Sequence, residues 1–580
     1  MNARADVAIV GGGPGGSTAG AYLRKHNPSL KVLILERERF PRDHIGESQL
    51  PAIGRVLHEM GVWDKIEGAG FPIKLGASYT WGKTTDPWEF EFMPLHLLPE
   101  KAERPGTYDS WRSRVAFQVD RAEYDDILLK HAAELGCEVR QGTRVTTVRR
   151  EGDRVTGLEL EGGGTVEARY YLDASGNAAI IRRAMGVKVD APTKLQNVAF
   201  WDYWSEPRLN EDLFGHGVTR VQIRSLPYGW LWYIPLSMTR TSVGLVCPAT
   251  YYKSCGKRPE QLYMEALKSE PLVWKLLETA KARGTVEATT DWSFVSERTY
   301  GANWYLVGEA LGFADPILAA GLTLTHWSGR HVACTILEKE RGVEDPAWLD
   351  REYDAQQIKR VRQHMRFAEY WYSANGCFAD LQQFCSEIAR DSGLKLNASA
   401  AFRWLSNGGL DDMPGFATAG GFSVSSIKQV QQRLVHDGVV DYLINGKNVF
   451  KLNLAGAEPA DVAVVQDGRV LRVPAYRRGA TMVPRVGVYG VMLEALAEHS
   501  RIDRIIEYCR AKLSAAMAPS IAETQVKEAL LCLEVMAQNY WVTCSKHANW
   551  PTITIDCSPE GEFIYSASSG PKRRPRGALG

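Results

Sequence analysis

The chain has 580 residues, of which 45% are apolar, and its 69 Lys and Arg residues almost balance its 68 Asp and Glu residues. This composition is typical of a globular protein of about two to four domains, and a net charge of +1 excludes the strongly basic class of nucleic-acid-binding proteins. Residues 1–6 are polar and lead directly into a predicted strand, and no apolar run reaches the length of a membrane span, so we expect a cytoplasmic protein with no nucleic-acid and no membrane partner.

Residues 7–36 predict a strand, a glycine-rich turn, a helix and a second strand. The apolar run 7–10 meets the turn without a spacer, and Gly11, Gly13 and Gly16 fit the pattern G-x-G-x-x-G. In this pattern the first glycine permits a tight turn, the second leaves room for a pyrophosphate, and the third lets the helix pack closely on the strand. The unpaired N–H groups of the helix then face the phosphates.

The second strand, residues 31–35, ends at Glu36, where a carboxylate can accept hydrogen bonds from ribose hydroxyls. Strand, turn, helix, strand and acid in register predict a dinucleotide site, and the alternative is a glycine-rich loop without a ligand. The expected cofactor contacts in this stretch are Gly11, Gly13, Gly15, Gly16, Ser17, Glu36 and Arg37.

Residues 40–48 form a predicted loop that carries a cation, an acid and a hydroxyl, which suits a polar cofactor. Pro41 and Gly46 punctuate it. Ser48 could also cap a helix predicted over residues 49–69, and the two roles are compatible.

Residues 71–82 predict a strand with Lys74 among apolar and aromatic neighbours. Lysine is seldom buried without a reason, but a lysine with its head group in solvent is the simpler interpretation. The following residues, 83–118, are rich in proline and aromatic side chains, which fits either a cover over a pocket or a loop packed on the body of the protein.

The next elements return the chain to the nucleotide. A helix is predicted over 119–135, followed by strands between 138 and 160, a hairpin turn at 162–164, and a strand at 168–172. That last strand leads into Asp173-Ala174-Ser175-Gly176, a turn that we expect beside the cofactor.

Alternation of period two over residues 195–300 predicts an antiparallel sheet, and hence a separate substrate layer. Trp230, Trp232 and Ile234 fall on one face of their strand and would form a bulky wall there. A tryptophan pair in a sheet is also a common core feature.

A buried strand at 304–307 leads into a glycine-rich loop at 308–321 and then a helix from Leu322 to about Glu340. The N-terminus of that helix can stabilise negative charge on a ring or on a bound anion. Helix is also predicted over 350–392, where an aromatic cluster fits either core packing or substrate contact.

The remainder of the chain reads as a separate C-terminal domain without legible chemistry. A loop-rich stretch contains Gly408, Pro414 and Gly420, and it precedes a hairpin at about 448–475 and helices over 484–540. The basic tail 572–576 is either a binding arm or a solvated end. The ten cysteines lack C-x-x-C pairs, so we predict reduced packing residues rather than disulfides or metal ligands.

Taken together, these motifs resemble the flavoprotein group that contains aromatic-ring hydroxylases, geranylgeranyl reductases and FAD-dependent halogenases, over about residues 5–345. The motifs are the glycine fingerprint, Pro41-Arg42-x-x-x-Gly46-Glu47-Ser48, Val119-x-Arg121, Asp173-Ala174-Ser175-Gly176, Gly308-Glu309-Ala310, Asp315-Pro316 and Gly321. Lys74 and Trp230-x-Trp232-x-Ile234-Pro235 are similar to the active-site lysine and the W-x-W-x-I-P signature of flavin-dependent halogenases.

The resemblance implies an α/β fold with a Rossmann-like FAD-binding domain, an antiparallel β-sheet substrate domain and an added, mostly helical α+β C-terminal domain. The expected FAD-binding segments are 1–70, 119–190 and 301–345. The substrate domain would comprise 71–118 and 191–300, followed by a helical segment and linker at 346–424 and the C-terminal domain at 425–580.

The resemblance also implies a reaction in which FADH2, O2 and chloride or bromide give hypohalous acid, which travels to Lys74. Lys74 would hydrogen-bond or covalently carry the halogen, and Trp230 and Trp232 would separate the flavin from the substrate. Halide would lie at Ala320 and Gly321. The implied catalytic residues are Lys74, Trp230, Trp232, Ile234 and Pro235, and the further FAD contacts are Arg42, Glu47, Ser48, Arg121, Asp173, Ser175, Gly308, Asp315, Pro316 and Leu322.

Two departures from the family pattern bear on the substrate and the halide. Ala319 and Ala320 stand where small hydroxyl residues are common, and Leu318 stands where halogenases of free tryptophan carry a glutamate. Phenolic, pyrrolic or carrier-protein-tethered acyl substrates are therefore expected. There is no second strand-linked glycine fingerprint for NAD(P)H, which implies a separate flavin reductase.

The alternatives are an FAD-dependent monooxygenase, hydroxylase or reductase of the same fold, and a non-catalytic flavoprotein. A hydroxylase predicts NAD(P)H oxidation by the pure protein, whereas a halogenase predicts almost none without a reductase. A nucleic-acid or partner-binding module at 425–580 would rest only on the hairpin–helix pattern and the basic tail.

Overall fold

The computed structural model describes residues 2–82, 84–93, 98–99, 103–207, 217–391, 418–419, 422–423, 442–479, 481–515, 519–557 and 563–568. The loop-rich stretch predicted around residues 408–421 falls mostly outside these ranges, and the basic tail 572–576 lies outside them. The chain divides into two compact units. Unit 1 comprises residues 1–396 and 465–471, and unit 2 comprises residues 397–464 and 472–580.

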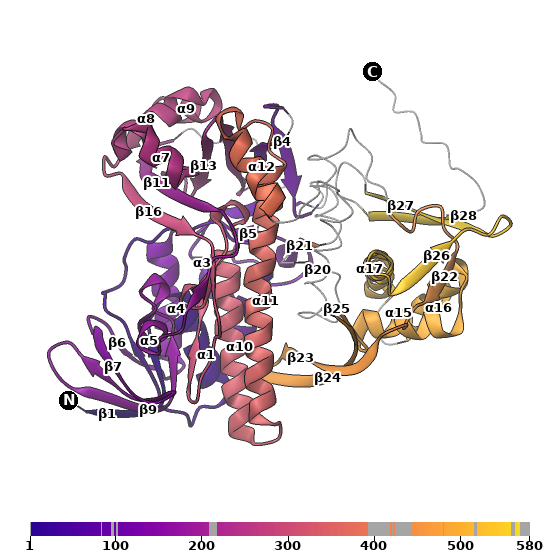
Figure 1. The fold of residues 1–580 in the computed structure, drawn as a ribbon, viewed down its shortest axis with the longest axis horizontal. Helices are drawn as coiled ribbons and strands as arrows, with labels where there is room; N and C mark the ends of the chain where they lie inside the picture. The colour runs from indigo at the N-terminus through magenta and orange to yellow at the C-terminus, as the bar shows by residue number, and fades with distance from the viewer. Residues whose placement is uncertain are drawn as a thin grey trace. The chain divides into compact units, whose positions relative to one another are not determined.

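Unit 1 contains a mixed sheet with the strand order β6-β2-β1-β9-β8-β7, in which β18 also pairs with β9. Figure 1 labels β1, β6, β7 and β9 of this sheet. β1 runs parallel to both β2 and β9, and its residues 7–10 are buried, as expected for a strand covered on both faces. The strands are β1 (Ala3–Val10), β2 (Val32–Leu35), β6 (Glu138–Arg140), β7 (Val145–Glu151), β8 (Arg154–Leu160), β9 (Thr165–Asp173) and β18 (Trp304–Leu306).

The main helices beside this sheet are α1 (Pro14–His26), α4 (Arg121–Glu134), α10 (Gly321–Arg341) and α11 (Pro346–Ser373). A buried histidine joins three of them, because the two ring nitrogens of His326 on α10 lie 2.8 Å from the Thr18 hydroxyl on α1 and 2.8 Å from the Tyr124 hydroxyl on α4. Burial lowers the pKa of His326 to about 3, so the ring is neutral and acts as a polar part of the helix packing.

A second sheet of unit 1 has the strand order β15-β11-β14-β13-β12-β3-β4, with β16 on β11 and β5 on β3. Its strands are β3 (Ile73–Thr80), β4 (Trp88–Glu91), β5 (Ala116–Phe117), β11 (Gln196–Ser205), β12 (Val218–Leu226), β13 (Gly229–Pro235), β14 (Arg240–Pro248), β15 (Lys281–Ala282) and β16 (Glu287–Trp292). The predicted antiparallel sheet is confirmed over β11 to β14, but β3 runs parallel to β12.

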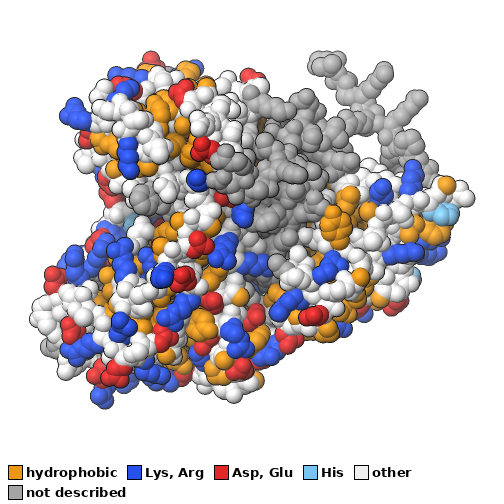
Figure 2. Space-filling model, in the orientation of Figure 1, with side chains coloured by type: hydrophobic (Ala, Val, Ile, Leu, Met, Phe, Trp, Pro, Cys, Tyr) orange, Lys and Arg blue, Asp and Glu red, His pale blue; other side chains and the backbone are white. Residues whose placement is uncertain are grey.

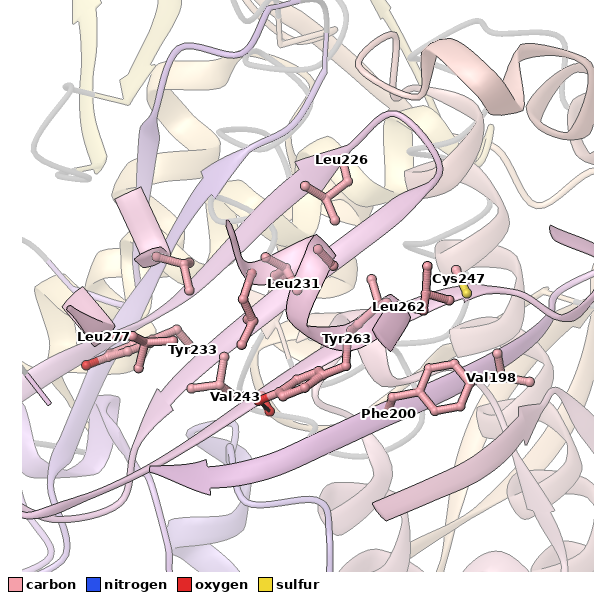
Figure 3. Packing of buried hydrophobic residues seen from close by; sticks show 14 of the residues in the cluster. Val198, Phe200, Leu226, Leu231, Tyr233, Val243, Cys247, Leu262, Tyr263 and Leu277 are labelled. Atoms are coloured by element: carbon pink, nitrogen blue, oxygen red, sulfur yellow. Dashed lines mark hydrogen bonds between the residues drawn. The ribbon is translucent and has the colours of Figure 1, made fainter. Parts of the chain in front are cut away.

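The two faces of the second sheet differ in what they carry. Alternate residues such as Phe200, Leu231 and Tyr233 point to an outer face, where they pack with Leu262 and Tyr263 of a helix (Figure 3). This face is covered by α7 (Ala249–Cys255), α8 (Pro259–Ser269) and α9 (Pro271–Leu277), three helices that the period-two interpretation of residues 195–300 missed. The intervening residues, Trp230 and Trp232 among them, therefore lie on the opposite, inner face.

The helix predicted over residues 49–69 is wrong as a single element. The chain forms α2 (Ala52–Met60) and α3 (Trp63–Gly68), because Gly61 adopts a φ of 88° between them. Ser48 is not an N-cap, since Pro51 occupies that position of α2 and Ser48 pairs with Gln118 as an isolated β-bridge.

The remaining elements of unit 1 are short, and those of unit 2 follow the predicted hairpin and helices. In unit 1 they include α5 (Ile180–Ala184), β10 (Val189–Asp190), β17 (Phe294–Ser296), β19 (Gly312–Phe313) and α12 (Gln382–Asp391). The later elements are β20 (Thr418–Ala419), β21 (Phe422–Ser423), β22 (Val449–Leu452), β23 (Glu458–Gln466), β24 (Arg469–Arg478), β25 (Thr481–Pro484), α15 (Gly487–Glu498), α16 (Ile502–Ser514), α17 (Pro519–Gln538), β26 (Val542–Ser545), β27 (Thr552–Cys557) and β28 (Phe563–Ser568).

Residues 465–471, at the turn between β23 and β24, complete unit 1. Arg469 donates two hydrogen bonds to the Glu338 carboxylate on α10, at 2.7 and 2.9 Å. The backbone oxygens of Val465 and Gly468 accept from Arg330 and Arg341 of the same helix, at 2.9 and 3.0 Å. A distant segment of the sequence is thus part of the N-terminal unit.

The described residues also bear on the predictions about charge, cysteines and membrane-spanning helices. Basic and acidic side chains are interspersed over the face drawn in Figure 2, in line with the near-zero net charge. Cys137, Cys247, Cys334 and Cys532 are buried free thiols, as predicted. Among the residues that the structure describes, no helix combines the length and the apolar character needed to cross a bilayer.

Candidate active site

The predicted nucleotide loops meet at one edge of the first sheet. Val10, at the end of β1, pairs with Leu35 of β2 and with Asp173 of β9, and Asp173 also pairs with Leu306 of β18. All four strands are parallel, so the loops that follow them emerge side by side. Open parallel sheets bind ligands at such a carboxyl edge, where the strand order reverses, and β1 with its neighbours on both sides provides that point.

The glycines of the first turn have different structural roles. A Cβ atom on Gly11, whose φ is +107°, would lie 2.2 Å from the Ala174 carbonyl oxygen, and one on Gly16 would lie 2.0 Å from the Gly11 carbonyl oxygen. A Cβ atom on Gly13 would meet only the Arg42 guanidinium, at 3.6 Å. Gly11 and Gly16 are therefore required by the chain itself, whereas Gly13 leaves open space of the kind that a phosphate needs.

Glu36 closes the turn in this structure. Its two carboxylate oxygens accept from the backbone N–H groups of Gly12, at 2.7 Å, and Glu38, at 2.9 Å, and the Ser17 hydroxyl donates to the Gly12 carbonyl at 2.8 Å. Arg37 is exposed and pairs with Glu38. The ribose contact of Glu36 stays a prediction.

Arg42 and Arg121 are held by one buried carboxylate. Asp125 accepts from Arg121 at 2.7 and 2.9 Å and from Arg42 at 3.0 Å, while Arg121 also donates to the Ile45 carbonyl. Burial alone would raise the pKa of Asp125, but the two guanidinium groups outweigh it and the pKa lies below its usual value. Sequence reasoning did not select Asp125, although its i,i+4 spacing from Arg121 on a predicted helix was a usable signal.

Asp173 acts as a helix anchor. Its carboxylate accepts from the Ser175 hydroxyl at 2.5 Å and from the N–H groups of Ile181 and Arg182, at 2.7 and 2.9 Å, at the start of α5. The cofactor roles of Asp173 and Ser175 stay predictions. Gly308 lies close to Thr325 of α10, at the same carboxyl edge as Asp173.

A buried polar group includes the end of the loop at residues 40–48. Burial raises the pKa of Glu47 to about 7, against the opposing effect of the nearby Ser242 and Tyr203 hydroxyls. Within the described residues, the Ser48 hydroxyl and the polar side-chain atoms of Gln118 are buried without a hydrogen-bond partner. Buried polar atoms are normally paired, so this group has the character of a surface that meets a polar ligand.

Lys74 is 3% exposed, so the interpretation that its head group lies in solvent is wrong. A register shift in β3 places Lys74 opposite Thr219 and the next pair at Gly76 and Arg220, so Lys74 turns to the face that carries Ala77 and Tyr79. Its ammonium donates to the Gln49 carbonyl at 2.8 Å. Burial lowers the pKa of Lys74 to about 7.

The predicted tryptophan wall lies on the same inner face as Lys74. Trp232 pairs with Ile223 on β12, and Lys74 pairs with Thr219, roughly 13 Å further along that strand. The Trp232 indole N–H donates to the Ser242 hydroxyl at 3.1 Å, and its ring lies over Gly244, where a Cβ atom would come within 2.2 Å of it. Ile234 and Pro235, at the end of β13, are also buried.

Trp230 is tied to a polar centre that the sequence did not reveal. Its indole N–H donates to the Tyr372 hydroxyl at 2.8 Å, and this hydroxyl lies 3.3 Å from Asp315. Asn197 donates to the other oxygen of Asp315 at 3.1 Å. Burial raises the pKa of Asp315 to about 7. Asp315 was predicted to contact the cofactor. Tyr372 was part of the aromatic cluster predicted on the helix over 350–392, and no local pattern pointed to Asn197.

The loop after Asp315 and Pro316 ends at α10. Ala319 has a φ of +53°, Ala320 is the N-cap, and the first helical hydrogen bond runs from the Leu324 N–H to the Ala320 carbonyl. The N–H groups of Gly321 and Leu322 precede that bond and are not needed by the helix. The halide site at Ala320 and Gly321 and the flavin contact of Leu322 stay predictions.

The amino-acid sequence matches a known protein family over most of unit 1. The family model described as tryptophan halogenase matches residues 6–111 and 100–377, which is more than half of the chain. The chain belongs to this family of flavin-dependent halogenases. Its members are oxidoreductases, and family membership implies FAD as the cofactor.

Individual halogenases are similar to this chain in sequence, and the share of each protein that aligns differs. Tryptophan 2-halogenase from Chondromyces crocatus is 31% identical over 354 residues, which are 59% of this chain and 62% of that protein. The 1H-pyrrole-2-carbonyl-[peptidyl-carrier protein] chlorinase of Pseudomonas fluorescens is 30% identical, over 65% of this chain and 86% of that protein. This chain therefore spans less than two thirds of the first of these relatives.

Solved halogenase structures share the fold. The myxobacterial chondrochloren halogenase CndH is 28% identical, with a TM-score of 0.58 over 74% of this chain and 97% of that one. The flavin-dependent halogenase CmlS has a TM-score of 0.69 over 98% of both chains. At 22% identity, the likeness to CmlS concerns the fold alone.

The residues of unit 1 around this carboxyl edge and the loop at residues 40–48 fit a dinucleotide cofactor. Gly13 presents open space in front of the helix α1, and the buried polar side-chain atoms of Ser48 and Gln118 have no hydrogen-bond partner within the described residues. The first feature suits a pyrophosphate and the second suits a polar ring system or its bound water.

Proposed function

We propose that this protein is a flavin-dependent halogenase that uses FADH2, O2 and chloride or bromide to form hypohalous acid, and that Lys74 passes the halogen to an electron-rich substrate. The observation that carries the proposal is the placement of Lys74. Its buried amine is hydrogen-bonded to Gln49, directly after the loop that carries Glu47 and Ser48.

The cofactor would be held by residues of the carboxyl edge. Gly13 would admit the pyrophosphate beside α1, while Gly11 and Gly16 would allow the close packing of the turn, which Glu36 holds through the Gly12 N–H group. When bound, reduced FAD supplies two electrons which, with O2, a halide ion and a proton, yield hypohalous acid and water. The N–H groups of Gly321 and Leu322 would hold the halide through the positive end of α10.

The chemistry proposed for Lys74 follows from its protonation. A pKa of about 7 gives similar amounts of amine and ammonium at neutral pH. The amine can take the halogen from hypohalous acid, which forms an N–halogen bond and releases water. The ammonium can instead donate a hydrogen bond to the oxygen of hypohalous acid. In either case the halogen replaces a hydrogen on the substrate carbon, and that hydrogen leaves as a proton.

Trp230 and Trp232 would form the barrier between flavin and substrate, so that only a small oxidant reaches Lys74. Both indoles are buried on the inner face of the sheet, and each has its N–H group fixed by a hydrogen bond. Fixed, bulky side chains suit a barrier, because a mobile one would admit the substrate to the flavin. Ile234 and Pro235 would extend this wall.

The substrate class that we propose is phenolic, pyrrolic or a carrier-tethered acyl group. Leu318 replaces the glutamate expected for free tryptophan, and two similar proteins are named as halogenases of a pyrrole-2-carbonyl group on a peptidyl-carrier protein. A separate flavin reductase would supply FADH2.

The test replaces Lys74 by Ala. The purified protein is mixed with FAD, a flavin reductase, NADH, bromide and candidate phenols or carrier-bound pyrroles, and products are identified by mass spectrometry. We expect halogenated product to fall by at least about 100-fold, since a positioned acid–base group contributes that much, while flavin oxidation continues.

The matched control is Lys130→Ala, on the exposed surface of α4, which should leave product formation unchanged. Halogenation that persists in Lys74→Ala would contradict the role of Lys74. An oxygenated product without halogen, made by the wild type with NAD(P)H alone, would replace the proposal by a hydroxylase.

A further inference from the structure

Trp230 is linked to the loop before α10 by a hydrogen-bonded group of four buried side chains. The Trp230 N–H donates to Tyr372 at 2.8 Å, and Tyr372 lies 3.3 Å from one oxygen of Asp315. The Asn197 amide lies 3.2 Å from the Tyr372 hydroxyl and 3.1 Å from the second oxygen of Asp315. All four residues are at most 2% exposed, so water does not compete for these bonds.

The four side chains come from separate parts of unit 1. Trp230 lies on β13, Asn197 on β11 and Tyr372 near the end of α11, and Asp315 is the N-cap of the short turn that precedes α10. The Tyr372 hydroxyl therefore joins Trp230 of the second sheet to the loop before α10. Its ring makes an edge contact with Trp81, with centroids 5.8 Å apart, and a tilted contact with Phe378, with centroids 6.0 Å apart.

We infer that Tyr372 is a positioning residue of the proposed halogenation, which holds the Trp230 indole in one orientation relative to the Asp315 loop. The effect of Tyr372 on halogenation rests on the proposed function, whereas its effect on the orientation of Trp230 does not. A barrier between oxidant and substrate works only if it stays aligned with the loop that leads to α10. The tyrosine hydroxyl supplies that alignment.

The alternative is that Tyr372 is a core residue whose hydroxyl is hydrogen-bonded only because it is buried. Such a residue would affect stability but not the orientation of one particular indole. The structure offers a matched comparison, because Trp232, two residues away, is held by Ser242 at 3.1 Å and not by Tyr372. Each indole can therefore be released separately.

The experiment uses the full chain with its tryptophans labelled with 15N. The indole N–H resonances of Trp230 and Trp232 are assigned by their loss in Trp230→Phe and Trp232→Phe. In Tyr372→Phe we expect the Trp230 resonance to shift upfield and to exchange faster with solvent, while that of Trp232 stays in place. Ser242→Ala should give the reverse pattern.

The second measurement is the division of reducing equivalents between halogenated product and hydrogen peroxide. In Tyr372→Phe we expect the share that reaches product to fall several-fold, with the dissociation constant of FAD unchanged. An unaltered Trp230 resonance or an unaltered product share in Tyr372→Phe would overturn the inference.

Two further outcomes are also decisive. If the wild type forms no halogenated product, the proposed function fails, while the resonance test still decides the positioning of Trp230. If Tyr372→Phe does not fold, 3-fluorotyrosine at position 372 keeps the shape and makes the hydroxyl more acidic. The Trp230 resonance should then shift and that of Trp232 should not, and no shift at Trp230 would contradict the inference.

Discussion

At the scale of single residues, the unusual feature is a buried lysine that has no opposing charge beside it among the residues that the structure describes. The ammonium of Lys74 donates to the Gln49 carbonyl and lies 5.4 Å from the centre of the Phe92 ring. Neither contact replaces the hydration that a full charge loses on burial. The fall of its pKa to about 7 is caused by this loss, and it makes the amine available as a nucleophile at neutral pH.

A dependence of stability on pH follows from Lys74. Below pH 7 both the folded and the unfolded state carry the charge, and the folded state bears the full cost of burying it. Between pH 7 and 10.5 the unfolded state binds more protons, so the free energy of unfolding rises with pH. Lys74→Met lacks this rise, and its stability gain over the wild type should be greatest below pH 7 and shrink towards pH 10.5.

Urea unfolding of both proteins without cofactor, at several pH values, measures this difference. Lys130→Met, at an exposed site on α4, is the control and should run parallel to the wild type over the same range. Parallel curves for Lys74→Met and the wild type would show that Lys74 keeps its proton in the fold.

At the scale of elements, the sequence predicted those turns and helices whose signals lie in neighbouring residues. The glycine turn between β1 and α1, the helix α4 and the helix α10 were found because their signals lie within a few residues of each element. The helices α7 to α9 were missed because they interrupt a long stretch of alternating residues. The register shift that turns Lys74 inward depends on the pairing of β3 with β12, which no residue near Lys74 reveals.

The candidate site divides in the same way. The glycines, Lys74 and the two tryptophans were selected by spacing and residue type. Tyr372 was noticed only as part of an aromatic cluster, because its bond to Trp230 joins residues 142 positions apart. Such a contact exists only once the two elements have packed.

Two of the glycines in the first turn, Gly13 and Gly16, should respond differently to substitution by valine. Gly13→Val adds a side chain to open space at a φ of −66°, so the packing of α1 on β1 should persist and the apo protein should unfold at an unchanged temperature. FAD should no longer be retained, because the side chain occupies the place of the pyrophosphate.

Gly16→Val is the matched comparison. Its Cβ atom would meet the Gly11 carbonyl at 2.0 Å, so α1 must move away from β1 and the apo protein should lose about 1–3 kcal/mol or more. Thermal unfolding and the flavin absorbance of the purified variants measure both effects. A yellow, FAD-replete Gly13→Val protein would contradict the assignment of the pyrophosphate site.

At the scale of the whole molecule, the first unit depends on a segment far along the chain. The Glu338 side chain is 0% exposed, and its carboxylate forms ion pairs with Arg341 of the same helix and with Arg469 of residues 465–471. Burial would raise the pKa of Glu338, but these two arginines hold it below its usual value. The buried carboxylate of Glu338 therefore needs a positive partner, Arg469, that lies outside residues 1–396.

Arg469→Ala should destabilise unit 1 by an amount on the order of 1–3 kcal/mol, because Glu338 keeps only Arg341. Adding Glu338→Gln should recover part of the loss, since a neutral amide needs less compensation. Unfolding by urea, followed through the fluorescence of bound flavin, reports on this unit. Arg504→Ala, in an exposed pair with Glu507 in unit 2, should change little, and equal effects of the two arginine variants would contradict the role of Arg469.

The discontinuity of unit 1 also has a consequence for biosynthesis. A ribosome releases residues 1–396 well before it reaches residues 465–471, which contribute to the same compact unit. During that interval the nascent helix α10 carries an acidic side chain and two arginines whose later partners have not yet been translated. Unit 1 therefore has its complete set of residues only after residues 397–464 of unit 2 have been synthesised.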